Sequence, residues 1–553
     1  MSDLIDIFGY LSVLLRACGL VAVTLTLGSV AFLLLLAVPR ALQWPAHAAA
    51  VSQGGMAALR WSALATVATT VAADGLVLLA LAGTLQLPLG ELLGASFLQA
   101  GLLQALAAAG LCVLACSPAL GRMRQVFLAA LAGVILLGLL GSSHAIARPG
   151  ERWAMLVASG AHLLGAALWL GGLPAFLLAL RRTNGSPAAQ HVGAAYSRLA
   201  VVGVGLLLLG AIAIGVGFIG SVEAVYGTAY GAMAATKTVL LACLLLLGLG
   251  NFLIIRRAAA DSPAAMRRVQ RLVEVEIAIG VVVLMAASSI TSQPPAVDLT
   301  RDRAAWSEVV ERMTPRLPRM ETPRHDDLAI PALQARLDAA QASAGDANRL
   351  QAFVPGGGEP PPRNAFDVAW SEYNHHWAGF IVLLVGIAAA AERTGRAPFC
   401  RHWPLLFLAL AGFLLLRSDP ETWPLGQIGF FESFRDPEVT QHRLFVLLVV
   451  AFAFFEWRVG NKPLAAGRRA LVFPMLVVVG SALLLTHSHA IANLKEQLLI
   501  EISHLLLGVM GLIAGSARWL QLRADGRLQA IAGWVWPLMF VLIGLLLLGY
   551  REA

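Results

Sequence analysis

Residues 486–504 read THSHAIANLKEQLLIEISH and join two strongly apolar runs of the chain. His487 and His489 end the first run, and Glu501 and His504 lie near the start of the second. Glu501 and His504 are three residues apart, so a helix would place them on one face. Imidazole and carboxylate groups are common metal ligands. We therefore expect a metal-binding site between two membrane helices here.

A similar pattern occurs earlier in the chain, where residues 141–162 read GSSHAIARPGERWAMLVASGAH. His144 ends one apolar run and His162 lies inside the next. Both stretches are typical of a helix, a short loop and a second helix, with histidine on each side of the loop. The pattern predicts a loosely duplicated site.

The composition is that of a polytopic membrane protein. Of 553 residues, 58% are hydrophobic and only 13% are charged, which excludes a soluble multi-domain protein. The net charge of +8 does not indicate nucleic-acid binding, because the basic residues lie in clusters between the apolar runs, where they signal orientation. The five cysteines lie in or beside apolar runs, so we expect no disulfide framework.

The apolar runs predict an all-α fold, a polytopic bundle of about 14 transmembrane helices arranged as eight and then six. The segment 293–367 is rich in Pro, Arg, Asp and Gly, which predicts an extramembrane linker with a short amphipathic helix near 330–342. We expect an N-terminal eight-helix membrane domain at 1–292, the linker at 293–367 and a C-terminal six-helix membrane domain at 368–553. The expected spans lie near 8–37, 58–85, 95–117, 125–146, 153–180, 198–220, 231–255, 270–292, 373–391, 403–417, 442–457, 470–487, 497–520 and 531–550.

Basic clusters such as Arg181–Arg182 and Arg256–Arg257 flank alternate connections, which the positive-inside rule assigns to the cytoplasm. Both termini and the linker are then expected in the periplasm. With this topology most of the twelve histidines lie at or just below the outer ends of the spans. Ionisable residues within membranes are costly and usually functional. The candidate metal ligands are His144, His162, His375, His376, His442, His487, His489, Glu501 and His504.

Three stretches in the first half resemble one family. They are HLLGAALWLGG at 162–172, AYGAMAATKTVLLACLLLLGLGNF at 229–252 and RLVEVEIAIGVVVLMAASSITSQPPA at 271–296. In this order they resemble the CopD copper-resistance family of bacterial inner-membrane proteins, over about His144–Pro295. The last six spans extend past the short form of that family. The family pattern falls here on His162, Trp169, Tyr230, Lys237 and Asn251, of which His162 is the expected metal ligand.

The resemblance implies copper handling at the plasma membrane, usually described as inward delivery of periplasmic copper beside a soluble CopC-type copper-binding protein. We therefore expect a multi-pass inner-membrane copper-binding protein, not an enzyme, that transports copper from the periplasm across the membrane for copper homeostasis and resistance. No GxxxxGK[ST] motif is present, so transport would be driven by gradients or by ligand exchange. The expected partners are copper, the CopC-type protein and the lipid bilayer, without nucleic acid.

Two alternatives remain open. Histidines on facing helices near one membrane face also suit axial haem ligation, which would make the chain a cytochrome-like redox protein. Alternatively, the chain holds copper as an assembly factor without moving it. Imidazole binds Cu, Zn, Fe and Ni, so ligand type alone does not name the metal.

Overall fold

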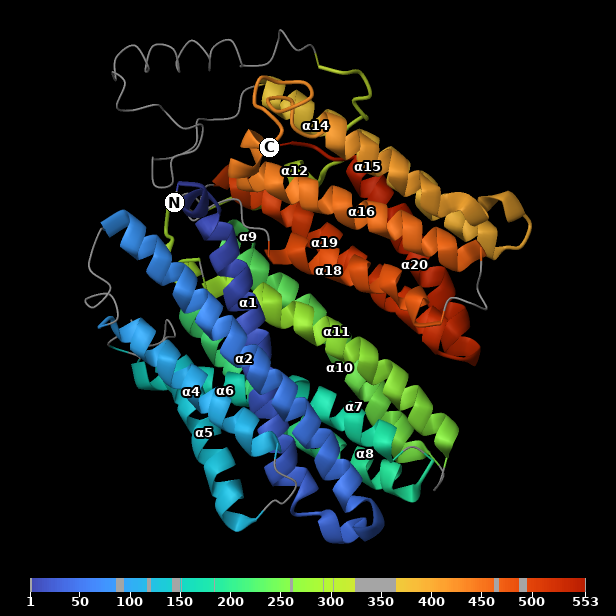
Figure 1. The fold of residues 1–553 in the computed structure, drawn as a ribbon. Helices are drawn as coiled ribbons and strands as arrows, with labels where there is room; N and C mark the ends of the chain where they lie inside the picture. The colour runs from blue at the N-terminus through green and yellow to red at the C-terminus, as the bar shows by residue number, and fades with distance from the viewer. Residues whose placement is uncertain are drawn as a thin grey trace. The chain divides into compact units, whose positions relative to one another are not determined.

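The computed structural model describes residues 2–85, 94–116, 121–141, 150, 152–183, 185–258, 262–291, 293–301, 303–323, 365–461, 467–486 and 495–552. These residues are largely helical, and within them the only β-pairing is an isolated bridge between Thr422 and Ile428. The helices form two compact units, described separately here (Figure 1). The N-terminal unit contains Leu11–Arg303 and Thr486–Asn493, and the C-terminal unit contains Met1–Tyr10, which includes the first turns of α1, with Ala304–Leu485 and Leu494–Ala553.

Thirteen helices in the described ranges are long and apolar enough to cross a membrane, which confirms the predicted all-α membrane fold. A further helix, α16 (Pro437–Asn461), covers the run predicted at 442–457. Large apolar side chains point outward from many helices; Leu137 is 69% exposed and Val216 is 73% exposed. Such surfaces suit lipid, because the bilayer solvates apolar side chains. The protein is therefore a multi-pass membrane protein.

The N-terminal unit is built from long helices that pack in neighbouring pairs, with α2 against α4, α6 against α8 and α10 against α11 (Figure 1). Its helices are α1 (Ser2–Phe32), η1 (Leu33–Ala37), α2 (Ala48–Leu85), α4 (Ser96–Cys116), α5 (Arg122–Gly141), α6 (Arg152–Ala166), η5 (Ala167–Gly171), α7 (Leu173–Arg182), α8 (Pro187–Phe218), α9 (Val222–Gly227), α10 (Ala229–Arg257) and α11 (Pro263–Thr291).

The run predicted at 153–180 is not one regular helix. It is α6, then the π-helical turn η5, then α7, which begins after Gly172 with Pro174 in its first turn. All five residues of η5 are buried. Gly28 of α1 meets the Gly171 backbone so closely that no Cβ fits at either position. Single π-helical turns within α-helices are frequent at functional sites.

The C-terminal unit positions its polar residues through close helix packing. Its helices are α12 (Trp306–Met313), α14 (Ala365–Arg393), η8 (Pro398–Leu405), α15 (Leu406–Arg417), α16, α18 (Val472–Thr486), α19 (Lys495–Arg523) and α20 (Gly526–Leu548). A Cβ at Gly379 of α14 would lie 2.6 Å from the Leu548 nitrogen, and one at Gly386 would lie 2.6 Å from the Val541 nitrogen. These glycines let α14 and α20 touch along their length, which brings the end of the chain beside the first turns of α14.

An aromatic core holds the other end of this unit together. Phe407 of α15 and Phe473 of α18 pack with ring centroids 6.2 Å apart, and Phe540 of α20 lies 5.8 Å from Phe407. Phe407 and Phe473 are 2% and 1% exposed. Offset and edge-on aromatic pairs of this kind stabilise a core beyond their buried area.

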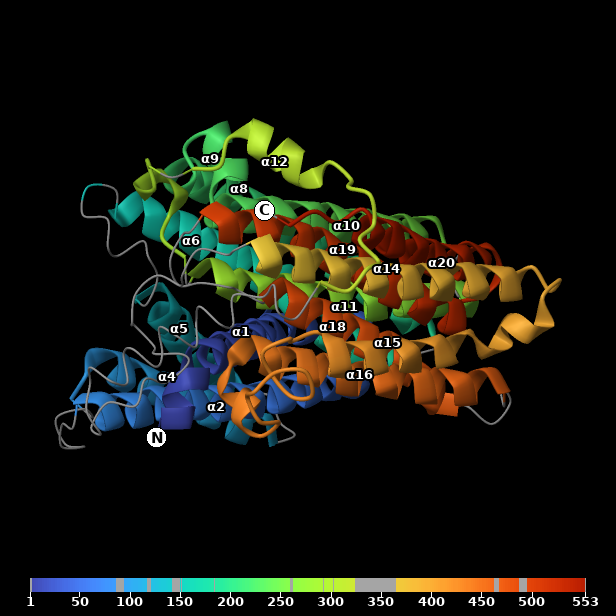
Figure 2. The same ribbon diagram turned by 90° about the horizontal axis from the view of Figure 1, so that it is seen from above.

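Of the predicted linker, the described residues from 293 to 303 belong to the N-terminal unit and residues 304–323 belong to the C-terminal unit, whose helix α12 is labelled in Figure 2. Arg312 of α12 donates to the Leu499 carbonyl oxygen at 3.1 Å, and the Arg316 backbone N–H donates to the Gly549 carbonyl oxygen at 3.1 Å. The helix predicted near 330–342 lies outside the described residues.

Candidate metal centre

His375 lies two to three turns into α14 and is partly buried within the C-terminal unit. Its Nδ1–H donates to the Ser371 carbonyl oxygen at 2.8 Å, so Nε2 carries the lone pair. A metal-binding histidine commonly donates its second N–H to a backbone carbonyl in this way, which fixes the tautomer and the ring orientation. The ring also stacks on Tyr550, with centroids 3.8 Å apart.

His504 of α19 is the second imidazole of this cluster. The ring centroids of His375 and His504 lie 6.1 Å apart. A ring nitrogen lies about 1 Å from its centroid and a metal–nitrogen bond is about 2 Å, so one ion bound between two imidazoles needs centroids about 6 Å apart. The observed separation has the length that one ion held in line between two facing ring nitrogens would need, and the two ring planes are inclined by 46°. Glu501, predicted to share a face with His504, is buried one turn earlier on the same helix.

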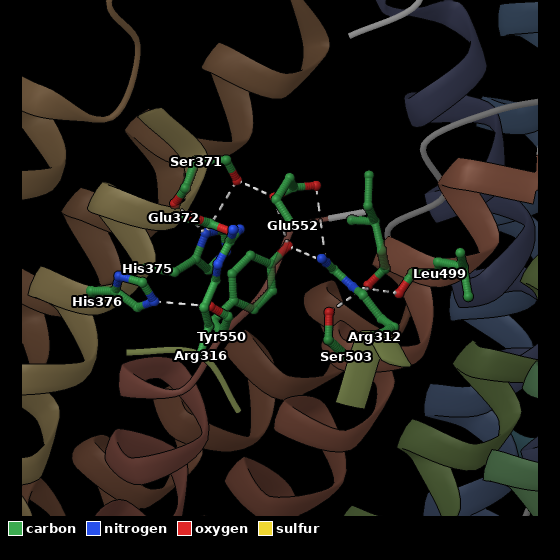
Figure 3. A network of polar contacts seen from close by, with 11 residues as sticks. Arg312, Arg316, Ser371, Glu372, His375, His376, Leu499, Ser503, Tyr550 and Glu552 are labelled. Carbon is green, nitrogen blue, oxygen red and sulfur yellow. Dashed lines mark hydrogen bonds and ion pairs between the residues drawn. The ribbon is translucent and has the colours of Figure 1, made fainter. Parts of the chain in front are cut away.

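A network of polar contacts surrounds His375 (Figure 3). Glu552 accepts hydrogen bonds from Ser371 and from the Tyr550 hydroxyl, the latter at 2.9 Å, and it lies 3.9 Å from the Arg312 guanidinium. Arg312 also donates to the Tyr550 hydroxyl and sits 4.4 Å from the centre of its ring. The side chains of Arg312 and Glu552 are 2% and 1% exposed. The two opposite charges therefore neutralise each other in a place that water does not reach.

Burial, helped by the negative charge of Glu552, raises the pKa of Tyr550 above its ordinary value. The phenol therefore keeps its proton and remains a donor to Glu552. This arrangement holds the Tyr550 ring against His375 and limits the directions from which an ion can reach the imidazole.

His376 is adjacent in sequence but performs a different task, because consecutive helical residues point about 100° apart. Its Nδ1 accepts the Arg319 backbone N–H at 2.6 Å, and its Nε2 donates to the Tyr550 carbonyl oxygen at 2.8 Å. The side chain is fully buried. Both ring nitrogens are therefore engaged in joining the segment after α12 to the end of the chain.

His442, near the start of α16, forms a histidine–carboxylate pair. Its Nδ1 lies 2.7 Å from Asp419 Oδ1, and Asp419 also accepts a hydrogen bond from the Ser418 hydroxyl at 2.6 Å. Burial alone would raise the pKa of Asp419, but the hydrogen bond and charge of His442, with Ser418 and Arg443, hold it below its ordinary value. His442 also interacts electrostatically with His375.

The remaining predicted ligands lie elsewhere. His162 is in the N-terminal unit, where its Nδ1 lies 3.1 Å from the Leu207 carbonyl oxygen of α8. His144, His487 and His489 lie outside the described residues. Within the described ranges, no three His, Cys, Asp or Glu side chains are grouped closely enough to hold a metal ion. Among the described candidate ligands, His375 and His504 are two imidazoles in ring contact.

Sequence reasoning did not identify Tyr550, Glu552, Arg312 or Asp419 as neighbours of the histidines. Tyr550 and Glu552 follow the last apolar run, and Arg312 lies in the expected linker, so no spacing relates them to His375. A charged residue just after a membrane span, as at Asp419, is a weak signal that could have been used.

Residues 190–290 match the family model described as copper resistance protein D. Over 136 residues the chain is 31% identical to the copper transport protein CutJ of Bacillus subtilis (strain 168). That match covers 24% of this chain and 24% of the relative, so the chain spans about a quarter of the curated relative's length. No solved structure matches. The predicted resemblance to the CopD family is confirmed over residues 190–290 of the chain.

Proposed function

We propose that this chain transports copper across the bacterial inner membrane, from the periplasm inward, for copper homeostasis and resistance. The observation that carries the proposal is the match of residues 190–290 to the copper resistance protein D model. The relative named a copper transport protein supports the same function. Transport without chemical conversion of a substrate also fits a chain in which the buried polar residues lie on membrane helices.

The C-terminal unit is the proposed entry point for the ion. His375 and His504 bind copper between them, and His442, oriented by Asp419, offers a neighbouring imidazole for exchange. Imidazole is a good ligand for copper, and an ion with only two nitrogen ligands can be released to a further ligand. His144, His162, His487, His489 and Glu501 remain proposed copper ligands, and His376 is proposed to act in the C-terminal unit by holding the chain end.

The proposed donor is a soluble periplasmic CopC-type copper-binding protein. A donor that passes copper to these histidines by ligand exchange needs no nucleotide hydrolysis, and the driving force is then the gradient or the difference in ligand affinity between donor and acceptor. The protein in this proposal is not an enzyme.

The first experiment measures metal content and the visible spectrum of the detergent-purified protein, with copper uptake into proteoliposomes. We expect bound copper, no Soret band, and uptake that falls strongly in the His375→Ala/His504→Ala variant. The matched control is His402→Ala, because His402 belongs to the same unit but bonds Trp457 through its Nδ1 at 3.1 Å.

A Soret band would favour the haem alternative, since facing imidazoles also ligate haem iron. Bound copper without uptake would favour the holding or assembly role. Uptake unchanged in the double variant would contradict the proposed entry point.

A further inference from the structure

Glu276 is a buried carboxyl group on α11, inside the segment that matches the copper resistance model. The residue is 2% exposed. Its Oε2 lies 2.6 Å from Asn251 Nδ2 of α10, and its Oε1 accepts a hydrogen bond from Trp169 Nε1 of η5 at 3.3 Å. Glu276 lies five residues past Arg271, which is about 7.5 Å further along the helix.

The groups that face Glu276 are uncharged. Asn251 and Gly248 face it from α10, Trp169 faces it from η5, and the titratable group nearby is Tyr196 of α8, whose hydroxyl donates to the Trp169 carbonyl oxygen. In the described part of the chain no ion pair joins Glu276 to a cation. An ionised carboxylate out of water without a cation is costly, so the group needs a neutralising partner.

Glu274, two residues earlier, shows the opposite arrangement on the same helix. It pairs with Arg181 of α7 at 2.9 Å and with Arg271 at 2.8 Å, and its side chain is 4% exposed. Two equally buried carboxyl groups therefore differ in charge balance. Glu274 is neutralised by the protein, whereas Glu276 is not.

The surroundings of Glu276 leave room for a small species only. A Cβ at Gly248 would lie 3.2 Å from Glu276 Oε1 and 3.4 Å from the Trp169 ring, so glycine makes the space that these side chains fill. A void of about 10 Å³ beside the carboxyl is lined mainly by apolar residues, including Leu25, Leu170 and Gly280. That is about the space of a single water molecule. The void is too small for a hydrated metal ion.

We propose that Glu276 is a proton-binding site of the N-terminal unit, in which a proton neutralises the carboxylate reversibly. Asn251 suits both states of the carboxyl group. Its Nδ2 donates to the ionised carboxylate, and after rotation of the amide its Oδ1 accepts from the protonated carboxylic acid. In the structure Asn251 Oδ1 is buried without a hydrogen-bond partner, so an acceptor is present at the site.

The proton site gives the proposed transporter a driving force. This coupling of proton binding to copper transport rests on the proposed function. Binding of a proton at Glu276 removes one negative charge from the interior of the helices that match the copper family. Passage of a copper cation and occupancy by a proton would then disfavour each other electrostatically, because both compete for the same negative charge. A proton gradient can in this way bias the direction of copper movement.

Proton binding is tested directly by infrared difference spectroscopy of the purified full-length protein as pH is changed. We expect a pH-dependent C=O stretching band of a protonated carboxyl in the wild type, the same band in Glu274→Gln, and its loss in Glu276→Gln. A spectrum unchanged by Glu276→Gln would overturn the proposal. Trp169→Phe keeps the carboxyl and removes one donor, so it should move the midpoint of the titration; an unmoved midpoint counts against the site.

Coupling is tested separately by copper uptake into proteoliposomes with and without an imposed pH gradient. We expect the gradient to change the wild-type rate severalfold and to leave the Glu276→Gln rate unchanged. A wild type that takes up no copper defeats the proposed function, yet the infrared result still decides whether Glu276 binds a proton. Equal responses to the gradient in wild type and variant defeat the coupling.

Discussion

The two units bury carboxyl groups in contrasting surroundings. Glu552 of the C-terminal unit lies 3.9 Å from Arg312 and accepts hydrogen bonds from Ser371 and Tyr550. Glu276 of the N-terminal unit meets the amide of Asn251 and the indole of Trp169, without an ion pair in the described residues. The first carboxylate has a fixed countercharge, and the second depends on a mobile one. Similar burial therefore supports different chemistry.

The imidazoles differ between the units in the same way. His375 and His504 face each other at 6.1 Å in the C-terminal unit. His162 in the N-terminal unit lies against the Leu207 carbonyl oxygen, with Gly210 of α8 allowing close contact. Under the two proposals the units contribute differently: the C-terminal unit provides the imidazole pair for copper entry, and the N-terminal unit provides the proton site at Glu276.

The largest expected effect separates these tasks. His375→Ala/His504→Ala should weaken copper binding at least about tenfold, because even an outer partner of a metal ligand typically contributes 10–100-fold. Glu276→Gln should leave copper binding unchanged. Copper titration of the purified variants, with metal content after dialysis, measures both. Equal losses of copper binding in the two variants would contradict the assignment of copper binding and proton binding to different residues.

The next effect tests the fixed countercharge. Arg312→Ala leaves Glu552 buried without its cation, which should lower the free energy of unfolding by about 3–5 kcal/mol. Arg551 pairs with Glu311 nearby, but their side chains are 32% and 63% exposed, so Arg551→Ala should cost about 0–1 kcal/mol. Unfolding of both variants in mixed micelles supplies the comparison. A cost for Arg312→Ala no larger than for Arg551→Ala would show that the buried pair contributes little.

The apolar runs of the sequence predicted the helices well, because a span needs about 20 apolar residues whatever its neighbours are. The interruption of one predicted span by η5 was not predicted, since it depends on contact between Gly171 and Gly28, which lie far apart in the sequence. Length and composition carry no information about such a contact.

The histidines show the same limit. Their places near the ends of apolar runs identified them as candidates, yet NHHW presents His375 and His376 as equals. Only the packing of α14 against α20 shows that His376 has both nitrogens engaged and that His375 stacks on Tyr550. Arg312, Tyr550 and Glu552 come from distant segments, so no local spacing could have predicted their network.

A third prediction tests the close packing that places His375. Gly379→Ala puts a Cβ 2.6 Å from the Leu548 nitrogen, and the resulting shift of α14 against α20 should cost about 1–3 kcal/mol. Gly412 on α15 has open space around it, so Gly412→Ala should be neutral or stabilise its helix by up to about 1 kcal/mol. Unfolding of both variants in mixed micelles measures the difference. If Gly379→Ala were as well tolerated as Gly412→Ala, the two helices would not depend on this contact.

The smallest expected effect concerns pH and the Asp419–His442 pair. The folded-state pKa of Asp419 is lowered, so its contribution to stability is fully present above the unfolded pKa of about 3.9 and is lost as pH falls through the folded value. Because His442 is 34% exposed, we expect Asp419→Asn to cost only about 0.5–1.5 kcal/mol near neutral pH. The variant should also lose part of the acid sensitivity that the wild type shows below about pH 4. Thermal unfolding of wild type, Asp419→Asn and the exposed control Asp525→Asn between about pH 7 and 3 measures how stability changes with pH. If Asp419→Asn left this pH dependence unchanged, the pair would not stabilise the fold.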